Sequence, residues 1–319
     1  MRLFILLALF LACGCGTPSL LITPVSNVNR LDEIQVQAGK GWSPKKIAMI
    51  EVEGMLLNAR TGGFMQPSEN KVSLFAQQLE IAGNDAAVKA VVLRVNSPGG
   101  TVTASDTMYQ ILSRFKEKTK KPIVVSTQEV AASGAYYVSC AADEIIVNPT
   151  SVVGSIGVIF QTFDVSGTMG KIGVRSEAIK SGPLKDMGSP FHPLSDSERQ
   201  VFQGLVDDFY GRFTSVVKEH RVLTEENFKI GTDGRVFSGT HAVEIGLADR
   251  VGMLEDALDR AKELAGELNA KVVTYKRPYG YRGSIYADST IPPAQTNVIQ
   301  LLPDAESILP TGFYYLWKP

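Results

Sequence analysis

A serine within a run of small residues is the first candidate for a reactive group in this chain. Ser133 lies in the segment 131–135 (AASGA), after an apolar run at 122–125 and before apolar residues at 136, 137, 140 and 141, which are spaced as on one helix face. The pattern predicts a strand, a turn and a helix. The Ser133 hydroxyl would then lie at the helix N-terminus, where backbone N–H groups favour developing negative charge. Ser133 is therefore either a nucleophile or an ordinary N-cap residue.

A second turn, at 97–100 (SPGG), follows an apolar and β-branched run at 87–95. That run predicts a strand buried on both faces, and hence a parallel sheet, whose strand ends open on one edge. Acyl transfer needs N–H donors directed at one oxyanion. Glycine allows close backbone approach, so the amides of Gly100 and Gly134 are candidates for this pair. The alternative is that the two turns are unrelated loops.

No histidine has the spacing of a metal site or an obvious catalytic partner. His192, His220 and His241 are the three histidines of the chain, and no Gly-rich phosphate loop occurs. We predict neither a metal nor a cofactor. A Ser-His-Asp triad stays open as an alternative, because triads are defined in space rather than by sequence order.

Two lysines are the other candidates for a general base. Lys180 and Lys185 follow the segment 175–179, which is predicted to be a strand. A lysine deprotonates serine only when it is neutral, and its ordinary pKa of about 10.4 keeps it charged at neutral pH. Burial lowers that pKa, whereas the neighbouring Asp186 favours the charged form. The residues themselves do not choose between the two lysines.

Strands and helices alternate along most of the chain, which predicts an α/β fold. Strands are predicted at 46–52, 87–95, 122–126, 145–147, 158–160, 175–179 and 271–275, and a strand followed by a turn at 233–239. Helical spacing predicts helices at 70–81, 134–142, 240–245 and 254–268, a helix capped by Thr103 with Asp106, and a long helix capped by Ser195 with Glu198.

The composition and the N-terminus limit the classes of function. Lys plus Arg is 32 and Asp plus Glu is 33, a formal net charge of −1, which argues against nucleic acid as a partner. Residues 1–12 join one positive charge to a short apolar run, as in an export signal. Cys15, preceded by Gly14, is the preferred lipidation site over Cys13, because cleavage before Cys13 would leave a very short signal. A plain secretory signal or an uncleaved anchor is the alternative.

These features divide the chain into an export signal (1–15), a linker (16–45), a folded domain (46–275) and an extended C-terminal arm (276–319). The apolar end of the arm is expected to pack on the body or on a neighbouring subunit. Cys140 lies in an apolar segment and is interpreted as a small core residue.

Five segments in order resemble the signal peptide peptidase A family of serine peptidases: 96–100 (NSPGG), 131–137 (AASGAYY), 154–158 (GSIGV), 180–186 (KSGPLKD) and 234–239 (GRVFSG). The resemblance covers residues 46–275 and implies the ClpP/crotonase-like fold, an α/β fold of repeated β-β-α units. It implies a Ser-Lys dyad with Ser133 as nucleophile and Lys185 as general base. Ser155 then orients the lysine amine, and the amides of Gly100 and Gly134 form the oxyanion hole. Ala135 stands where the family often has glycine.

The resemblance also implies a bacterial membrane enzyme that cleaves remnant signal peptides, and a homo-oligomeric ring whose dyad is completed between adjacent subunits. We therefore expect a serine endopeptidase for apolar peptides, anchored by lipid or by its N-terminal segment on the extracytoplasmic side of the bacterial membrane. Two alternatives stay open. One is a non-peptidase acyl-transfer enzyme on the same fold, which the export signal disfavours. The other is a non-catalytic scaffold.

Overall fold

The computed structural model describes residues 30–41, 44–59, 69–277 and 312–317. The chain divides into two compact units, residues 1–30 and 31–319, and every described strand and helix belongs to the second. The predicted signal, Cys13 and Cys15 lie outside the described residues, as does most of the predicted arm.

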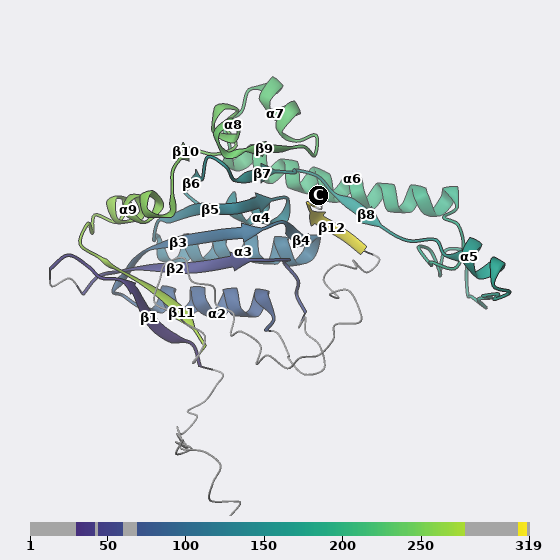
Figure 1. Ribbon diagram of the computed structural model, residues 1–319, viewed down its shortest axis with the longest axis horizontal. Helices are drawn as coiled ribbons and strands as arrows, with labels where there is room; N and C mark the ends of the chain where they lie inside the picture. Colours follow the sequence, from purple (N-terminus) through teal and green to yellow (C-terminus); the bar gives the residue numbers. More distant parts are fainter. Residues whose placement is uncertain (1–29, 42–43, 60–68, 278–311, 318–319) are drawn as a thin grey trace, which may run out of the picture. The chain divides into compact units, whose positions relative to one another are not determined.

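Strands and helices alternate as expected of an α/β protein (Figure 1). The strands are β1 (Asp32–Gln37), β2 (Lys46–Glu53), β3 (Val88–Ser97), β4 (Gly99–Thr101), β5 (Ile123–Ala132), β6 (Glu144–Val147), β7 (Val152–Gly154), β8 (Ile159–Gln161), β9 (Val236–Ser238), β10 (Arg250–Val251), β11 (Lys271–Lys276) and β12 (Gly312–Leu316). The helices are α2 (Lys71–Asn84), α3 (Val102–Thr119), α4 (Gly134–Ser139), α5 (Ser166–Lys171), α6 (Asp196–His220), α7 (Glu225–Gly231), α8 (Gly239–Glu244) and α9 (Leu254–Leu264).

The large sheet has the order β1-β11-β2-β3-β5-β6-β10, with neighbours parallel except β1, which is antiparallel to β11. β5 pairs with β6 through its first half and with β7 through residues 130–132. At its end β5 thus pairs with β7, which pairs in turn with β9, so β7 and β9 also belong to this sheet. β4, β12 and β8 form a second, three-stranded antiparallel sheet.

Both faces of the large sheet are buried, which confirms the prediction made for the run at 87–95. In β2, Ile47 and Met49 belong to a cluster with residues of α9, whereas Ala48 and Ile50 belong to the larger cluster with residues of α2, α3 and α4. Alternate residues of a strand point to opposite faces, so one strand contributes to both clusters. The turns after β3 and β5 therefore extend from strands that are buried on both faces.

Several sequence predictions need correction. The segment 175–179 has no regular structure and its residues are exposed, so the predicted strand there is wrong. α3 begins after Thr101, whose side chain accepts a hydrogen bond from the Ala104 amide, so the predicted capping pair of Thr103 and Asp106 is also wrong. Residues 32–37, expected to be part of the linker, form β1.

The other differences concern where elements end. β5 runs on to Ala132, α4 ends at Ser139 and α9 ends at Leu264. Several short elements were not predicted: β4, β7, β10, β12, α5 and α7. The capping box of Ser195 and Glu198 at the start of α6 is confirmed. Within the described residues, no helix combines the length and apolar character needed to cross a bilayer.

Candidate active site

Ser133 occupies a strained turn between β5 and α4. Its backbone angles, φ 54° and ψ −118°, are rare for a residue with a side chain and store on the order of 1–3 kcal/mol. The conformation is held from both sides, because the Ser133 amide donates to the Gly154 carbonyl at 2.7 Å and its carbonyl accepts from the Tyr137 amide at 2.9 Å. Such a sharp strand-to-helix turn presents a serine hydroxyl at the end of a sheet.

The Ser133 hydroxyl is buried, and its oxygen has no hydrogen-bond partner among the described residues. A buried hydroxyl without a partner is uncommon in a native structure and calls for an explanation such as a catalytic role. The serine makes no side-chain cap to α4, so the alternative interpretation of Ser133 as an ordinary N-cap is not supported.

The two glycine turns meet beside Ser133. A Cβ atom added to Gly99, whose φ is 97°, would lie 2.6 Å from the Gly134 amide nitrogen. A Cβ on Gly134 would clash with the Ser105 hydroxyl, and one on Gly100 would clash with the backbone of Leu56. Glycine is therefore required on steric grounds at all three positions. The sequence prediction that the turns after β3 and β5 come together is confirmed.

Ser155 lies next to Ser133 on the neighbouring strand end. β7 is parallel to β5 with Ala132 opposite Gly154, so Ser133 and Ser155 are the next residues on each chain. Ser155 is buried and has a positive φ of 51°, and its amide donates to the Arg235 carbonyl at 2.7 Å. The 154–158 and 234–239 segments thus support the same turn from one side.

A strand from the C-terminal end of the chain runs across these turns. β12 is antiparallel to β4, with Tyr315 opposite Gly100 and Leu316 opposite Gly99, and the Trp317 amide donates to the Pro98 carbonyl at 2.8 Å. The Tyr315 carbonyl oxygen lies 3.0 Å from where a Cβ on Gly134 would be, and a Cβ on Gly99 would clash with it. A backbone carbonyl therefore points at the place predicted for the oxyanion hole.

The Tyr315 side chain fills an aromatic pocket beside this carbonyl. It is fully buried, with its ring centroid 5.3 Å from that of Tyr137 and 4.8 Å from that of Phe213, and its hydroxyl donates to the Phe209 carbonyl at 2.6 Å. The pocket has a polar rim, since Tyr137 donates to Asp106 at 2.7 Å, and Arg212 forms an ion pair with the same carboxylate at 2.6 Å. Burial, followed by the Asp106 carboxylate, raises the pKa of Tyr137, which stays a neutral donor.

Lys185 is not part of this cluster in the single chain. It lies on an exposed turn in the segment between α5 and α6, which Figure 1 shows beyond the N-terminal end of α6, away from the large sheet. Lys180, the other lysine of that segment, pairs with Asp186 at 2.6 Å. The structure therefore brings together Ser133, Ser155 and the glycine turns but leaves the predicted base elsewhere.

The histidines occupy three separate places. The His220 ring lies edge-on to that of Tyr109, with Nε2 2.8 Å from the Tyr109 hydroxyl, and burial lowers the pKa of His220. His241 packs edge-on against Phe237. His192 lies in the segment before α6, near Asp186 of the same segment and near Glu198 in the first turn of α6. Cys140 is buried as predicted, and burial raises the pKa of its thiol to about 12.

Comparison with known proteins defines the class of this molecule. A sequence model of the Clp protease family matches residues 44–153, and one of Peptidase family S49 matches residues 115–267. The chain is 38% identical over 237 residues to "Putative signal peptide peptidase SppA" of Enterococcus faecium, which covers 74% of this chain and 69% of the relative.

Two further relatives are longer proteins of which the chain covers a smaller part. Protease 4 of Haemophilus influenzae is 34% identical over 227 residues, or 70% of this chain and 35% of the relative. The chloroplastic serine protease SPPA of Arabidopsis thaliana is 34% identical over 194 residues, or 60% of this chain and 28% of the relative.

The parallel sheet, the strained serine turn and these matches define a peptidase with the ClpP/crotonase-like α/β fold. Within that class, the chain belongs to Peptidase family S49, the family predicted from the five sequence segments.

Proposed function

We propose that this protein is a serine endopeptidase that cleaves apolar peptides bound as extended strands. Ser133 attacks the scissile carbonyl, and Lys185 accepts its proton. Ser155 orients the lysine amine, and the Gly100 and Gly134 amides bind the oxyanion. Attack breaks the peptide bond and leaves an acyl-enzyme on Ser133, which water then hydrolyses to release the second product.

The observation that carries the proposal is the position of β12. A segment of the chain lies as an antiparallel strand between β4 and β8, with the Tyr315 carbonyl at the glycine turns next to Ser133. Adding a strand to a sheet edge is a common way to bind a peptide, because main-chain hydrogen bonds hold it and pockets choose its side chains. The position of β12 supports a substrate bound in the same way, and we propose that the scissile bond follows the residue in the aromatic pocket.

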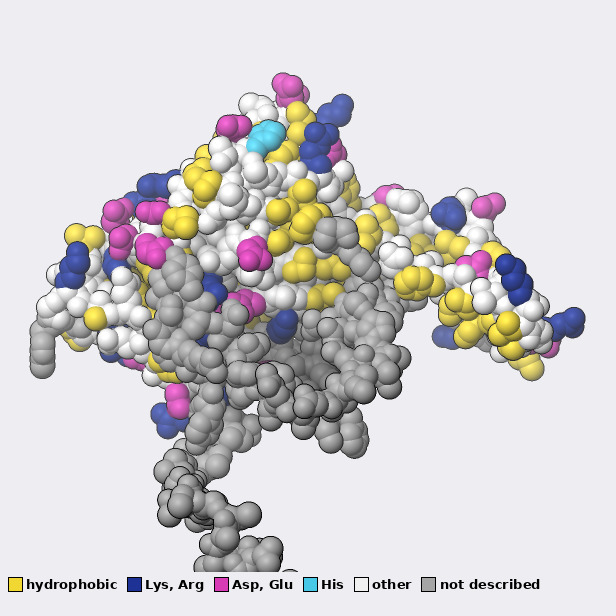
Figure 2. All heavy atoms as spheres, in the orientation of Figure 1, with side chains coloured by type: hydrophobic (Ala, Val, Ile, Leu, Met, Phe, Trp, Pro, Cys, Tyr) yellow, Lys and Arg dark blue, Asp and Glu magenta, His cyan; other side chains and the backbone are white. Residues whose placement is uncertain are grey.

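The proposed base comes from a neighbouring copy of the chain in a homo-oligomeric ring. Lys185 lies on a segment rich in exposed apolar side chains, among them Ile172, which is 70% exposed, and Phe191, which is 49% exposed. Figure 2 shows hydrophobic side chains gathered on the part of the molecule that carries α5. Exposed apolar groups of this kind are typical of an interaction surface. A contact there between copies would bury them and could carry Lys185 to a second Ser133.

The proposed location is the extracytoplasmic face of a bacterial membrane, with Cys15 as the lipid attachment point. An anchored enzyme would meet apolar peptides at the place where they accumulate. Removing the Cys15 side chain by substitution with serine is expected to move the protein from the membrane to the soluble fraction.

The function is tested by peptide hydrolysis. A fluorogenic peptide with the sequence of residues 312–317 is expected to be cut after its second tyrosine by the wild-type protein. Ser133→Ala and Lys185→Ala are each expected to lower kcat by at least about 1000-fold, because the nucleophile and its base act as one unit and the loss of either disables the reaction. Lys180→Ala is the matched control and is expected to retain activity. Cleavage by Ser133→Ala at the wild-type rate would refute Ser133 as the nucleophile. The activity would then come from a different reactive group or from a contaminating protease.

A mixing experiment separates the two origins of the base. Ser133→Ala and Lys185→Ala chains are co-expressed and purified together. In a head-to-tail ring with random mixing, about a quarter of the sites combine an intact serine with an intact lysine from the neighbour, so about a quarter of the activity returns. No recovered activity, from two variants that still assemble, would place both residues of the dyad in one chain.

A further inference from the structure

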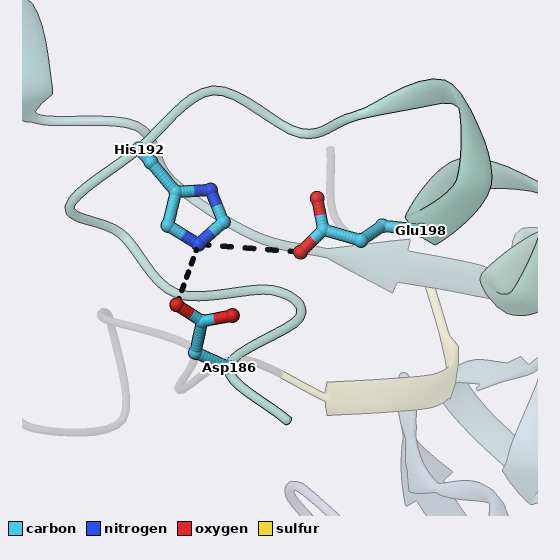
Figure 3. A group of neighbouring side chains, drawn as sticks. All are labelled: Asp186, His192 and Glu198. Carbon is cyan, nitrogen blue, oxygen red and sulfur yellow. Dashed lines mark ion pairs between the residues drawn. The ribbon is translucent and has the colours of Figure 1, made fainter. Parts of the chain in front are cut away.

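Three side chains converge between the Lys185 segment and the start of α6 (Figure 3). They are Asp186, His192 and Glu198, and one potential ligand atom from each lies within 4.8 Å of the others. His192 Nε2 is 3.4 Å from Asp186 Oδ2 and 4.0 Å from Glu198 Oε1. This group lies outside the candidate active site, and no role has been assigned to it so far.

The histidine is held in one tautomer by its backbone contact. His192 Nδ1 lies 3.0 Å from the Pro193 carbonyl oxygen, which can only accept, so Nδ1 carries a hydrogen. In the neutral ring, Nε2 then presents its lone pair to two carboxylate oxygens. A histidine fixed in this way by a carbonyl behind it is the usual arrangement of a metal ligand.

The spacing of the three atoms is longer than a hydrogen bond to a charged group requires. His192 Nε2 is buried, although the side chain is 34% exposed, and it makes no hydrogen bond to the described residues, with the two oxygens at 3.4 Å and 4.0 Å. A proton on Nε2 would need a carboxylate at about 2.7–2.9 Å to make a charge-assisted hydrogen bond. A metal ion with bonds of about 2.0–2.2 Å in tetrahedral geometry holds its ligand atoms roughly 3.4 Å apart. The His192 Nε2–Asp186 Oδ2 pair already has this spacing, whereas Glu198 Oε1, 4.0 Å from Nε2, would move inward when an ion binds. We propose that Asp186, His192 and Glu198 bind a divalent metal ion, for which Zn²⁺ fits the donor set.

The surroundings hold these ligands in place. The Glu198 side chain is 4% exposed, and its Oε2 accepts hydrogen bonds from the Ser195 amide at 2.7 Å and the Ser195 hydroxyl at 2.8 Å, which leaves Oε1 directed at the histidine. Asp186 uses its other oxygen, Oδ1, to bind Lys180 at 2.6 Å. The N-terminal dipole of α6 and the Lys180 charge oppose a cation, but two carboxylates outweigh them.

The site would tie down the segment that carries Lys185. Asp186 is the next residue after Lys185, whereas Glu198 belongs to the first turn of α6, so a bound ion joins the exposed turn to the long helix. Three protein ligands leave a fourth position for water or for a group from a neighbouring copy. This inference does not depend on peptidase activity, and metal binding is measured separately from it.

The test measures metal binding by the full-length chain after removal of metals with a chelator. Zn²⁺ is titrated in competition with a chromophoric chelator, and one ion is expected to bind per chain. Co²⁺ in its place is expected to give the strong visible bands of a four-coordinate ion. His192→Gln and Asp186→Asn are each expected to weaken binding at least 100-fold, and His241→Gln, a histidine outside the cluster, is the matched control.

The pH dependence supplies a second measurement. His192 binds the ion only as a neutral imidazole, so protons compete with the ion and affinity is expected to fall as the pH is lowered. Equal Zn²⁺ affinity in wild type and His192→Gln, or no saturable binding by a folded wild type, would overturn the proposal and leave an imidazolium held by two carboxylates.

Discussion

Replacing Tyr315 with alanine is expected to free the strand position between β4 and β8, the proposed peptide-binding groove, for peptides supplied from solution. Tyr315 anchors β12 through full burial, two ring contacts and the hydrogen bond to the Phe209 carbonyl. Truncation of a buried aromatic side chain costs about 3–5 kcal/mol, and most of this loss falls on the docking of β12 rather than on the large sheet. Each 1.4 kcal/mol is a factor of ten, so at the lower value the docked strand loses about 100-fold in stability.

The assay is hydrolysis of the fluorogenic peptide described above, with kcat and KM measured separately. A site that is competent only when β12 leaves has an apparent affinity reduced by the fraction of open molecules. The apparent KM is therefore expected to fall by up to about 100-fold in Tyr315→Ala with kcat unchanged. Tyr315→Phe keeps the ring and loses one hydrogen bond of about 1 kcal/mol, so its KM is expected to fall only about fivefold.

Two measurements test whether a change in KM reflects release of β12 rather than loss of the fold. Thermal unfolding shows whether Tyr315→Ala keeps its fold, and a synthetic peptide of residues 312–317 added to it should inhibit competitively. An unchanged KM in a folded Tyr315→Ala protein would refute the argument that β12 occupies the substrate position.

Three further predictions concern stability. Glu51→Ala is expected to lose about 3 kcal/mol in denaturant unfolding, because the nearly buried Lys276 and Arg94 bond to Glu51 at 2.8 Å and 3.1 Å and lose that carboxylate, while Arg94 keeps its ion pair with Glu53 at 3.5 Å. A loss below 1 kcal/mol would contradict this. Gly99→Ala should abolish peptide hydrolysis and lower the melting temperature, because its φ is 97° and its Cβ would approach the Gly134 nitrogen to 2.6 Å, and full activity would contradict the geometry. Burial lowers the pKa of His220 in the folded protein. The contribution of neutral His220 to the free energy of unfolding is therefore fully present above the unfolded pKa of about 6.5 and is lost as the pH falls towards the lower folded pKa. The free energy of unfolding measured between pH 7 and pH 5 should decline less steeply in His220→Gln than in the wild type.

The turns of the candidate site were predictable because their chemistry is local. Small residues at 131–135 between an apolar run and a helical pattern are enough to place Ser133 at a strand end, and parallel strands bring Gly100 and Gly134 to the same edge. The positive φ of Ser133 was not predictable, because it depends on the Gly154 carbonyl and the Tyr137 amide that hold the residue from both sides.

The remaining differences come from long-range pairing. β12 is separated from β4 by about two hundred residues, and no local sequence pattern predicts that Tyr315 lies opposite Gly100. The segment 175–179 was predicted to be a strand, but in the described structure it pairs with no other strand and its residues stay exposed. The choice of Lys185 over Lys180 came from family resemblance alone, and the position of Lys185 in the single chain does not test it.

The place of β8 has a consequence for what can enter the groove. In the described structure β8 is joined to the sheet through β12 alone, so the occupant forms the bridge between the two walls. Neighbouring strands lie about 4.8 Å apart, and the walls are therefore about 10 Å apart, wide enough for one extended chain. A helix with its side chains is about as wide as that whole gap, and a folded domain is far wider. If peptides bind where β12 lies, as proposed above, this spacing would admit one extended segment and would exclude a helix or a folded domain.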